Sequence, residues 1–146
     1  MHPTRPILDP PGIESFRALR PQAIDVVTER LYGVHGSIYE RFGQSGRDTC
    51  RQDLAFHLDF LQPVIEFGIV EPMAQYLRWQ AHVLVSRDIA ADHVALSVDW
   101  LAEFFAQRMQ PAHAAVVVGA LHAAKAQCLE LGADAGLTQA AAPTRW

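Results

Sequence analysis

The sequence is poor in the residues that mark small specialised protein classes. Two of the 146 residues are cysteines, Cys50 and Cys128, and they fall in separate segments, which excludes a disulfide framework and a zinc-type pair. No uninterrupted apolar run approaches the ~20 residues that a membrane-spanning helix needs. The opening stretch, MHPTRPILDPPGIE, is rich in proline and lacks the apolar centre of a signal peptide. We therefore expect a cytoplasmic protein that does not insert into a membrane.

Charge and composition narrow the function classes further. The formal net charge is −4, and no basic stripe suitable for nucleic acid is visible. Half of the residues are hydrophobic and 19% are charged, which is typical of a globular chain of one domain. No Ser/His/Asp order, paired carboxylates or phosphate-binding loop stands out, so we expect no enzymatic activity.

The spacing of apolar residues predicts an all-α protein of five or six helices. The helices are expected over about residues 21–42, 49–67, 72–86, 92–110 and 111–131. Pro21 should occupy a first turn, residues 43–47 should form a loop, and Asp48 or Thr49 should cap the next helix. Pro63 should lie inside the second helix, which should stop at Gly68. Residues 1–12 are expected to be an extended Pro-rich arm, residues 13–132 the helical domain and residues 133–146 a flexible tail.

Three segments within residues 31–122 resemble a known helical family. They are GSIYERF (36–42), CRQDLAFHL (50–58) and GIVEPMAQYL (68–77). In order and spacing they are similar to three motifs of the phycobiliproteins, the second being a C-x-R-D-x-x-Y-Y-L helix and the third ending in D-E-Y-L. The resemblance implies a globin-like helical stack that binds a tetrapyrrole. In that family the cysteine holds a bilin by a thioether, and the aspartate bonds its inner pyrrole nitrogens, which implies these roles for Cys50 and Asp53.

The departures from the family pattern favour haem over a light-harvesting bilin. Gln52 stands in place of the motif's arginine, while Phe56 and His57 replace its two tyrosines. The loop before Cys50 is also shorter. The chain is therefore most similar to the bilin-biosynthesis-associated globins of non-photosynthetic bacteria, which implies haem binding and bilin-biosynthesis enzymes as partners.

A haem site needs a neutral histidine on a buried, apolar face, and seven histidines are present. Spacings of three and four residues place Cys50, Asp53 and His57 on one helical face, so His57 is the expected iron ligand. His93 is a second expected ligand, and it aligns with Trp100. The expected cofactor-binding set is therefore Cys50, Asp53, His57, Tyr76, His93 and Trp100.

Each of these residues has a plainer explanation. His57 could be a core histidine bonded to a carbonyl, and Cys50 could be inert packing. Asp53 could cap a helix or pair with Arg47 or Arg51. By their helical neighbours, His82 should lie in solvent and His35 should pack.

The expected function is non-covalent haem binding, as a carrier, a sensor or an accessory to bilin formation. One alternative is covalent bilin binding at Cys50. The other is a ligand-free helical interaction module. The small apolar set Ile13, Phe16 and Leu19 needs a partner or the chain's own core to cover it, which favours a homodimer.

Overall fold

The computed structural model describes residues 5–133, which fold into helices joined by short turns. The elements in chain order are α1 (Pro10–Tyr39), the 3-10 helix η1 (Glu40–Phe42), α2 (Gly43–Phe67), α3 (Glu71–Ser86), α4 (Asp92–Arg108) and α5 (Pro111–Ala133). The predicted all-helical character is confirmed. Of the predicted arm and tail, residues 1–4 and 134–146 lie outside the described part.

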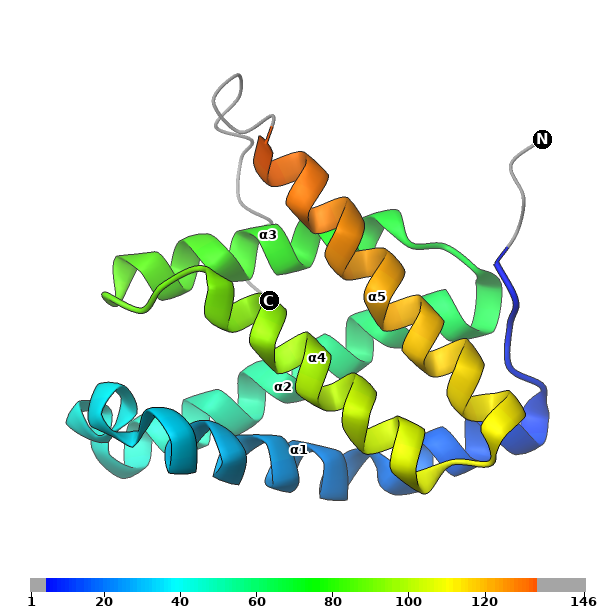
Figure 1. Ribbon diagram of the computed structural model, residues 1–146, viewed down its shortest axis with the longest axis horizontal. Helices are drawn as coiled ribbons and strands as arrows, with labels where there is room; N and C mark the ends of the chain where they lie inside the picture. The colour runs from blue at the N-terminus through cyan, green and yellow to red at the C-terminus, as the bar shows by residue number, and fades with distance from the viewer. Residues whose placement is uncertain (1–4, 134–146) are drawn as a thin grey trace.

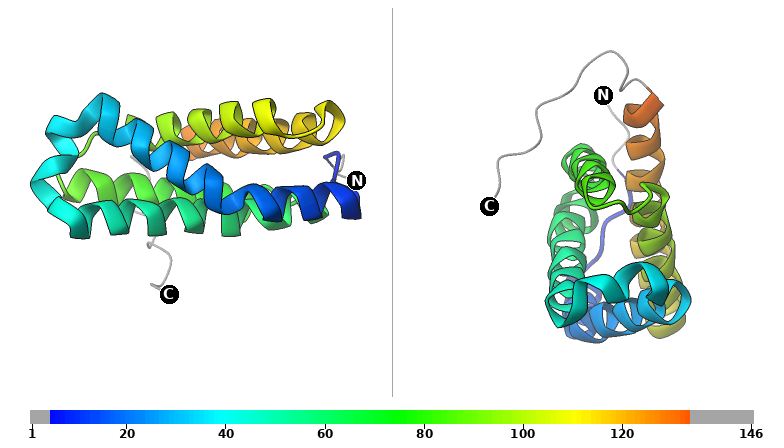
Figure 2. Two further views of the ribbon diagram at one scale, coloured as in Figure 1. Left: turned by 90° about the horizontal axis from the view of Figure 1, so that it is seen from below. Right: turned by 90° about the vertical axis from the view of Figure 1, so that its left-hand side faces the viewer.

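The helices form two layers with α1 running along one edge. α1 and α2 lie side by side and antiparallel, with η1 at the turn between them, and α4 and α5 form a second antiparallel pair (Figure 1). Figure 2 shows α2 and α3 in one layer and α4 and α5 in the other, while α1 crosses beside both. α5 packs against α3 as well as α4.

The first helix begins eleven residues before the predicted start at Pro21, so that prediction and the extended conformation of residues 10–12 are wrong. The Asp9 carboxylate accepts a hydrogen bond of 2.8 Å from the Gly12 backbone N–H, which caps the helix. Pro10 and Pro11 occupy the first turn, where the missing N–H groups cost nothing. Pro21 lies inside α1, where it removes one hydrogen bond.

The predicted loop over residues 43–47 is also wrong, because this stretch is the first turn of α2. A tight 3-10 turn and Gly43, whose φ is +63°, reverse the chain without further residues. Neither Asp48 nor Thr49 caps the helix. The Asp48 carboxylate accepts from the Gln44 side chain at 3.1 Å, and the Thr49 hydroxyl donates to the Ser45 carbonyl at 2.9 Å.

The second half of the chain follows the predictions closely. α2 contains Pro63 and ends at Gly68, which adopts the left-handed conformation with φ +75°. α3 ends at Ser86 and α4 begins at Asp92, as predicted. α5 starts at Pro111. Among the described helices, α5 is by length and composition able to cross a membrane over Pro111–Leu131, a criterion that core helices of globular domains also meet.

The apolar set near the start of α1 is covered by the chain's own core. The Phe16 side chain is fully buried and its ring centroid lies 5.2 Å from that of Phe105. Ile13 and Leu19 are half-buried against the same core. This set therefore supplies no reason to expect a homodimer.

Candidate functional site

A cluster of hydrogen-bonded polar side chains lies inside the core, between α2, α3 and α4. His57 is its centre and is 2% exposed. Its Nδ1 lies 2.8 Å from the Asp53 carbonyl oxygen and 2.7 Å from the Tyr76 hydroxyl oxygen, and its Nε2 lies 3.1 Å from the Ser97 hydroxyl oxygen. The Gln80 side chain donates to the Asp53 carboxylate at 2.9 Å. We call these five residues the core polar cluster.

The bonds of His57 define its tautomer. A carbonyl oxygen only accepts, so Nδ1 carries the ring proton and donates to Asp53. Nε2 is then unprotonated and lies 3.1 Å from the Ser97 hydroxyl, which donates its proton to the Val94 carbonyl at 2.7 Å. The Tyr76 hydroxyl donates to the same Asp53 carbonyl at 3.0 Å. The nitrogen that would bind an iron therefore faces a serine hydroxyl, and the ring has the carbonyl hydrogen bond expected of a core histidine.

Burial sets the protonation of the cluster. It lowers the pKa of His57 to about 4, although the hydrogen bond to the Asp53 carbonyl opposes the shift. Burial also raises the pKa of the Tyr76 hydroxyl well above its ordinary value. At neutral pH both side chains are uncharged.

Two members of the cluster, Gln80 and Ser97, were not expected from the sequence. Each follows an expected site residue by four positions, Gln80 after Tyr76 and Ser97 after His93, and so lies on the same helical face. A polar residue one turn from a buried candidate was the signal that could have identified both. Asp53 takes Gln80 as its carboxylate partner, whereas Arg47 pairs with Glu29.

The second expected iron ligand, His93, belongs to a neighbouring aromatic group. Its Nδ1 lies 2.6 Å from the Tyr39 hydroxyl oxygen, and its ring centroid lies 4.6 Å from that of His35. Burial lowers the pKa of His93, and the neighbouring His35 lowers it further. Trp100 lies on the far side of this group, under the Arg30 guanidinium, whose carbon is 4.3 Å from the ring centroid.

A small cavity lies beside four of the six expected cofactor-binding residues. It has a volume of about 40 Å³, and Cys50, Asp53, His57 and His93 line it, whereas Tyr76 and Trp100 do not. Small-molecule and cofactor sites usually have volumes of about 300–1,000 Å³. The cavity is too small for a tetrapyrrole. Haem at His57 would require α2 and α4 to separate and the contact between Nε2 and the Ser97 hydroxyl to break.

The thiol of Cys50 is half-buried between this cavity and a neighbouring hollow of about 230 Å³. Burial raises its pKa to about 11. Because the thiolate is the nucleophile, a thiol with this pKa is almost entirely unreactive at neutral pH. The environment therefore disfavours spontaneous thioether formation with a bilin.

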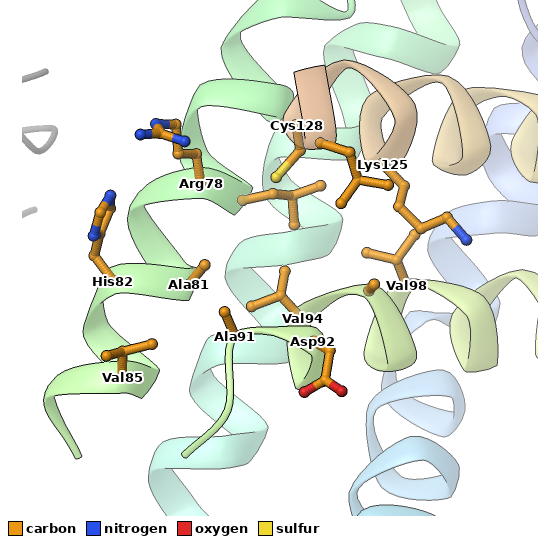
Figure 3. Close-up of a pocket in the computed structure, with 13 residues that line it drawn as sticks. Arg78, Ala81, His82, Val85, Ala91, Asp92, Val94, Val98, Lys125 and Cys128 are labelled. Atoms are coloured by element: carbon orange, nitrogen blue, oxygen red, sulfur yellow. The ribbon is translucent and has the colours of Figure 1, made fainter. Parts of the chain in front are cut away.

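A larger apolar cleft lies between α3, α4 and α5 (Figure 3). Its volume is about 600 Å³. The residues lining this α3–α5 cleft are Leu77, Arg78, Ala81, His82 and Val85 of α3, Ala91 just before α4, Asp92, Val94, Ala95 and Val98 of α4, and Lys125, Cys128 and Leu129 of α5. Small side chains on α3 and α4 leave the space open, and Val85 and Leu129 expose more than half of their surface at its edge. An exposed apolar wall of this kind is typical of a binding site.

His82 is exposed, as predicted, and it lies at the rim of this cleft. The cleft was not predicted from the sequence, because its three walls come from segments separated by loops and become neighbours only through packing. A different hollow of about 420 Å³ beside Trp100 is lined by Asp99 and Glu103, whose carboxylates form ion pairs with Lys125 and Arg30.

Within residues 5–133, no three His, Cys, Asp or Glu side chains are placed to hold a metal ion. Haem does not need such a group, because its ring supplies four nitrogens and one imidazole can complete the attachment. No protein-family model, curated protein or solved structure matches this chain.

Proposed function

We propose that this globin-like helical protein binds haem or a related tetrapyrrole non-covalently, and that the ligand occupies the α3–α5 cleft. The observation that carries the proposal is the cleft itself, which has about 600 Å³ of space and mostly apolar walls. Removing a large flat apolar ring from water into such walls is favourable in proportion to the area buried. The protein would then serve as a haem carrier or sensor, or as an accessory to bilin formation.

His82 is the proposed axial ligand, in place of His57. It is the histidine that lines the cleft, and its exposed imidazole makes no hydrogen bond to another described residue that would have to break. Iron, when bound, supplies a coordination position that a neutral imidazole can fill. His57 and His93 have a structural role in this proposal, because each ring is held by tyrosine and neighbouring polar groups inside the core.

A titration with hemin tests the proposal. Ala81→Phe should fill the cleft and weaken hemin binding at least tenfold, because the added ring takes the ligand's space. Ala18→Phe, at an exposed position of α1, is the matched control and should bind like the unchanged protein. Binding that is unaffected by Ala81→Phe would place the ligand elsewhere and overturn the proposal.

The axial ligand has its own readout in the Soret band. His82→Ala should shift this band, whereas His57→Phe should leave it in place. If His57→Phe shifts the band and His82→Ala does not, the ligand is His57 and the core opens to admit the haem.

A ligand-free interaction module is the second candidate function. The observation that favours it is the core polar cluster, in which His57 has the bonds of an ordinary core histidine. This candidate predicts that the purified protein stays colourless and that hemin binds no more tightly to the unchanged protein than to Ala81→Phe.

A further inference from the structure

The positively charged side chains around the α3–α5 cleft are not equivalent. Lys125 lies on α5, and its Nζ is 2.6 Å from an Asp99 carboxylate oxygen. This ion pair compensates the ammonium charge, so Lys125 has little attraction left for an acidic ligand.

Arg78 is the positive charge at the cleft that has no acidic partner among residues 5–133. It is half-buried on α3, and within residues 5–133 its guanidinium forms no hydrogen bond or ion pair with another residue. Figure 3 shows the side chain at the edge of the cleft, on the α3 side. Its field reaches the cleft interior, because it lowers the pKa of the Cys128 thiol while burial raises it. A planar guanidinium with all of its donors available can bind a carboxylate through two parallel hydrogen bonds.

The opposite wall of the cleft has the opposite sign. Asp92 lies on the α4 side, across the cleft from Arg78 (Figure 3). A carboxylate there repels an acidic group, whereas the middle of the cleft is apolar and accepts neither charge. The cleft therefore distinguishes the two ends of an elongated or flat ligand.

We propose that Arg78 binds the acidic group of the ligand, so that the cleft selects amphipathic carboxylic acids and orients their acidic edge toward α3. This inference rests on the proposed function, and it assigns the specificity of the same cleft. For haem, the acidic edge is the one that carries the two propionates. A neutral ring of the same shape loses the contact with Arg78.

Comparison of hemin with hemin dimethyl ester tests the inference, because the two compounds differ only in the acidic groups. Arg78→Gln should weaken hemin binding at least tenfold and leave binding of the ester unchanged. Arg78→Lys should retain part of the hemin affinity, since it keeps the charge but loses the paired hydrogen bonds. Arg108→Gln removes an exposed arginine of α4 that is not part of the cleft, and it should change neither affinity.

The possible outcomes separate the two proposals. If the unchanged protein binds acid and ester equally well, or if Arg78→Gln weakens both to the same extent, the role of Arg78 is overturned while cleft binding stands. If the unchanged protein binds neither compound, the proposed function fails and the inference fails with it. Retained ester binding also shows that the Arg78 variants are folded.

Discussion

Acid should destabilise this fold in large part through His57. The imidazole titrates near 6.5 in an unfolded chain, whereas in the folded protein burial lowers its pKa to about 4. Between these two values the unfolded state binds a proton that the folded state does not. Stability is therefore fully present above pH 6.5 and falls as the pH decreases toward 4, where the loss levels off. The difference of about 2.5 pH units corresponds to ~3 kcal/mol of unfolding free energy.

Urea unfolding followed by circular dichroism at several pH values between 7 and 4 measures this loss. His57→Phe keeps a ring in the space but removes the titrating nitrogen, and the hydroxyls of Tyr76 and Ser97 keep carbonyl partners in Asp53 and Val94. The unfolding free energy of the unchanged protein should fall by ~3 kcal/mol more than that of His57→Phe over this range. Subtracting the two curves removes the contribution of other groups, including His93, whose pKa is also lowered.

Equal acid sensitivity of the two proteins would refute this reasoning. An NMR titration supplies the second check. The chemical shifts of the His57 ring protons should not change through protonation of the imidazole until the pH approaches 4. A midpoint near 6.5 would mean that the ring is open to water.

Three further predictions concern single positions. Tyr76→Phe should lower the unfolding free energy by about 1–2 kcal/mol in a urea melt at pH 7, because the lost hydroxyl donates to the buried Asp53 carbonyl; no change would mean that this hydroxyl is solvated. In a Cys128→Ala background, Cys50 should react with iodoacetamide about a hundredfold more slowly at pH 7.5 than a free thiol, since its pKa is raised to about 11; reaction at the free-thiol rate would contradict the burial. Gly68→Ala should cost about 1–2 kcal/mol in the same melt, because φ is +75° there, and an unchanged midpoint would argue against the left-handed helix end.

The bounds of a helix were predictable from the sequence where a single start or stop residue marked its end and no second candidate lay nearby. α3 follows Gly68, and the polar turn that begins with Arg87 and Asp88 separates it from α4, so the start of α3 and the break between the two helices could be read from the sequence. The start of α1 was not predicted correctly, because Asp9 and Pro10 form a stronger helix start than Pro21. A proline can also be tolerated inside a long helix. The turn before α2 was also missed, since a 3-10 turn and one glycine shorten a loop to almost nothing.

The candidate site shows a different limit of sequence reasoning. The spacing of Asp53 and His57 placed them on one face, and the structure brings both to one cavity. Spacing carries no information on the volume left between helices, which depends on how all the side chains pack. The alanines of the α3–α5 cleft, such as Ala81 and Ala95, were likewise ordinary helix formers in the sequence, and only tertiary packing makes them the wall of a cleft.

The magnetism of ferric haem can test whether the bound ligand lies in the α3–α5 cleft. Hemin broadens the NMR signals of nearby methyl groups, whereas zinc protoporphyrin has no unpaired electrons and serves as the control. With hemin bound, the strongest broadening should occur at Val85, Val98 and Leu129, which line the α3–α5 cleft. Strongest broadening at Leu31 and Leu54, which line the cavity beside His57, would contradict the account.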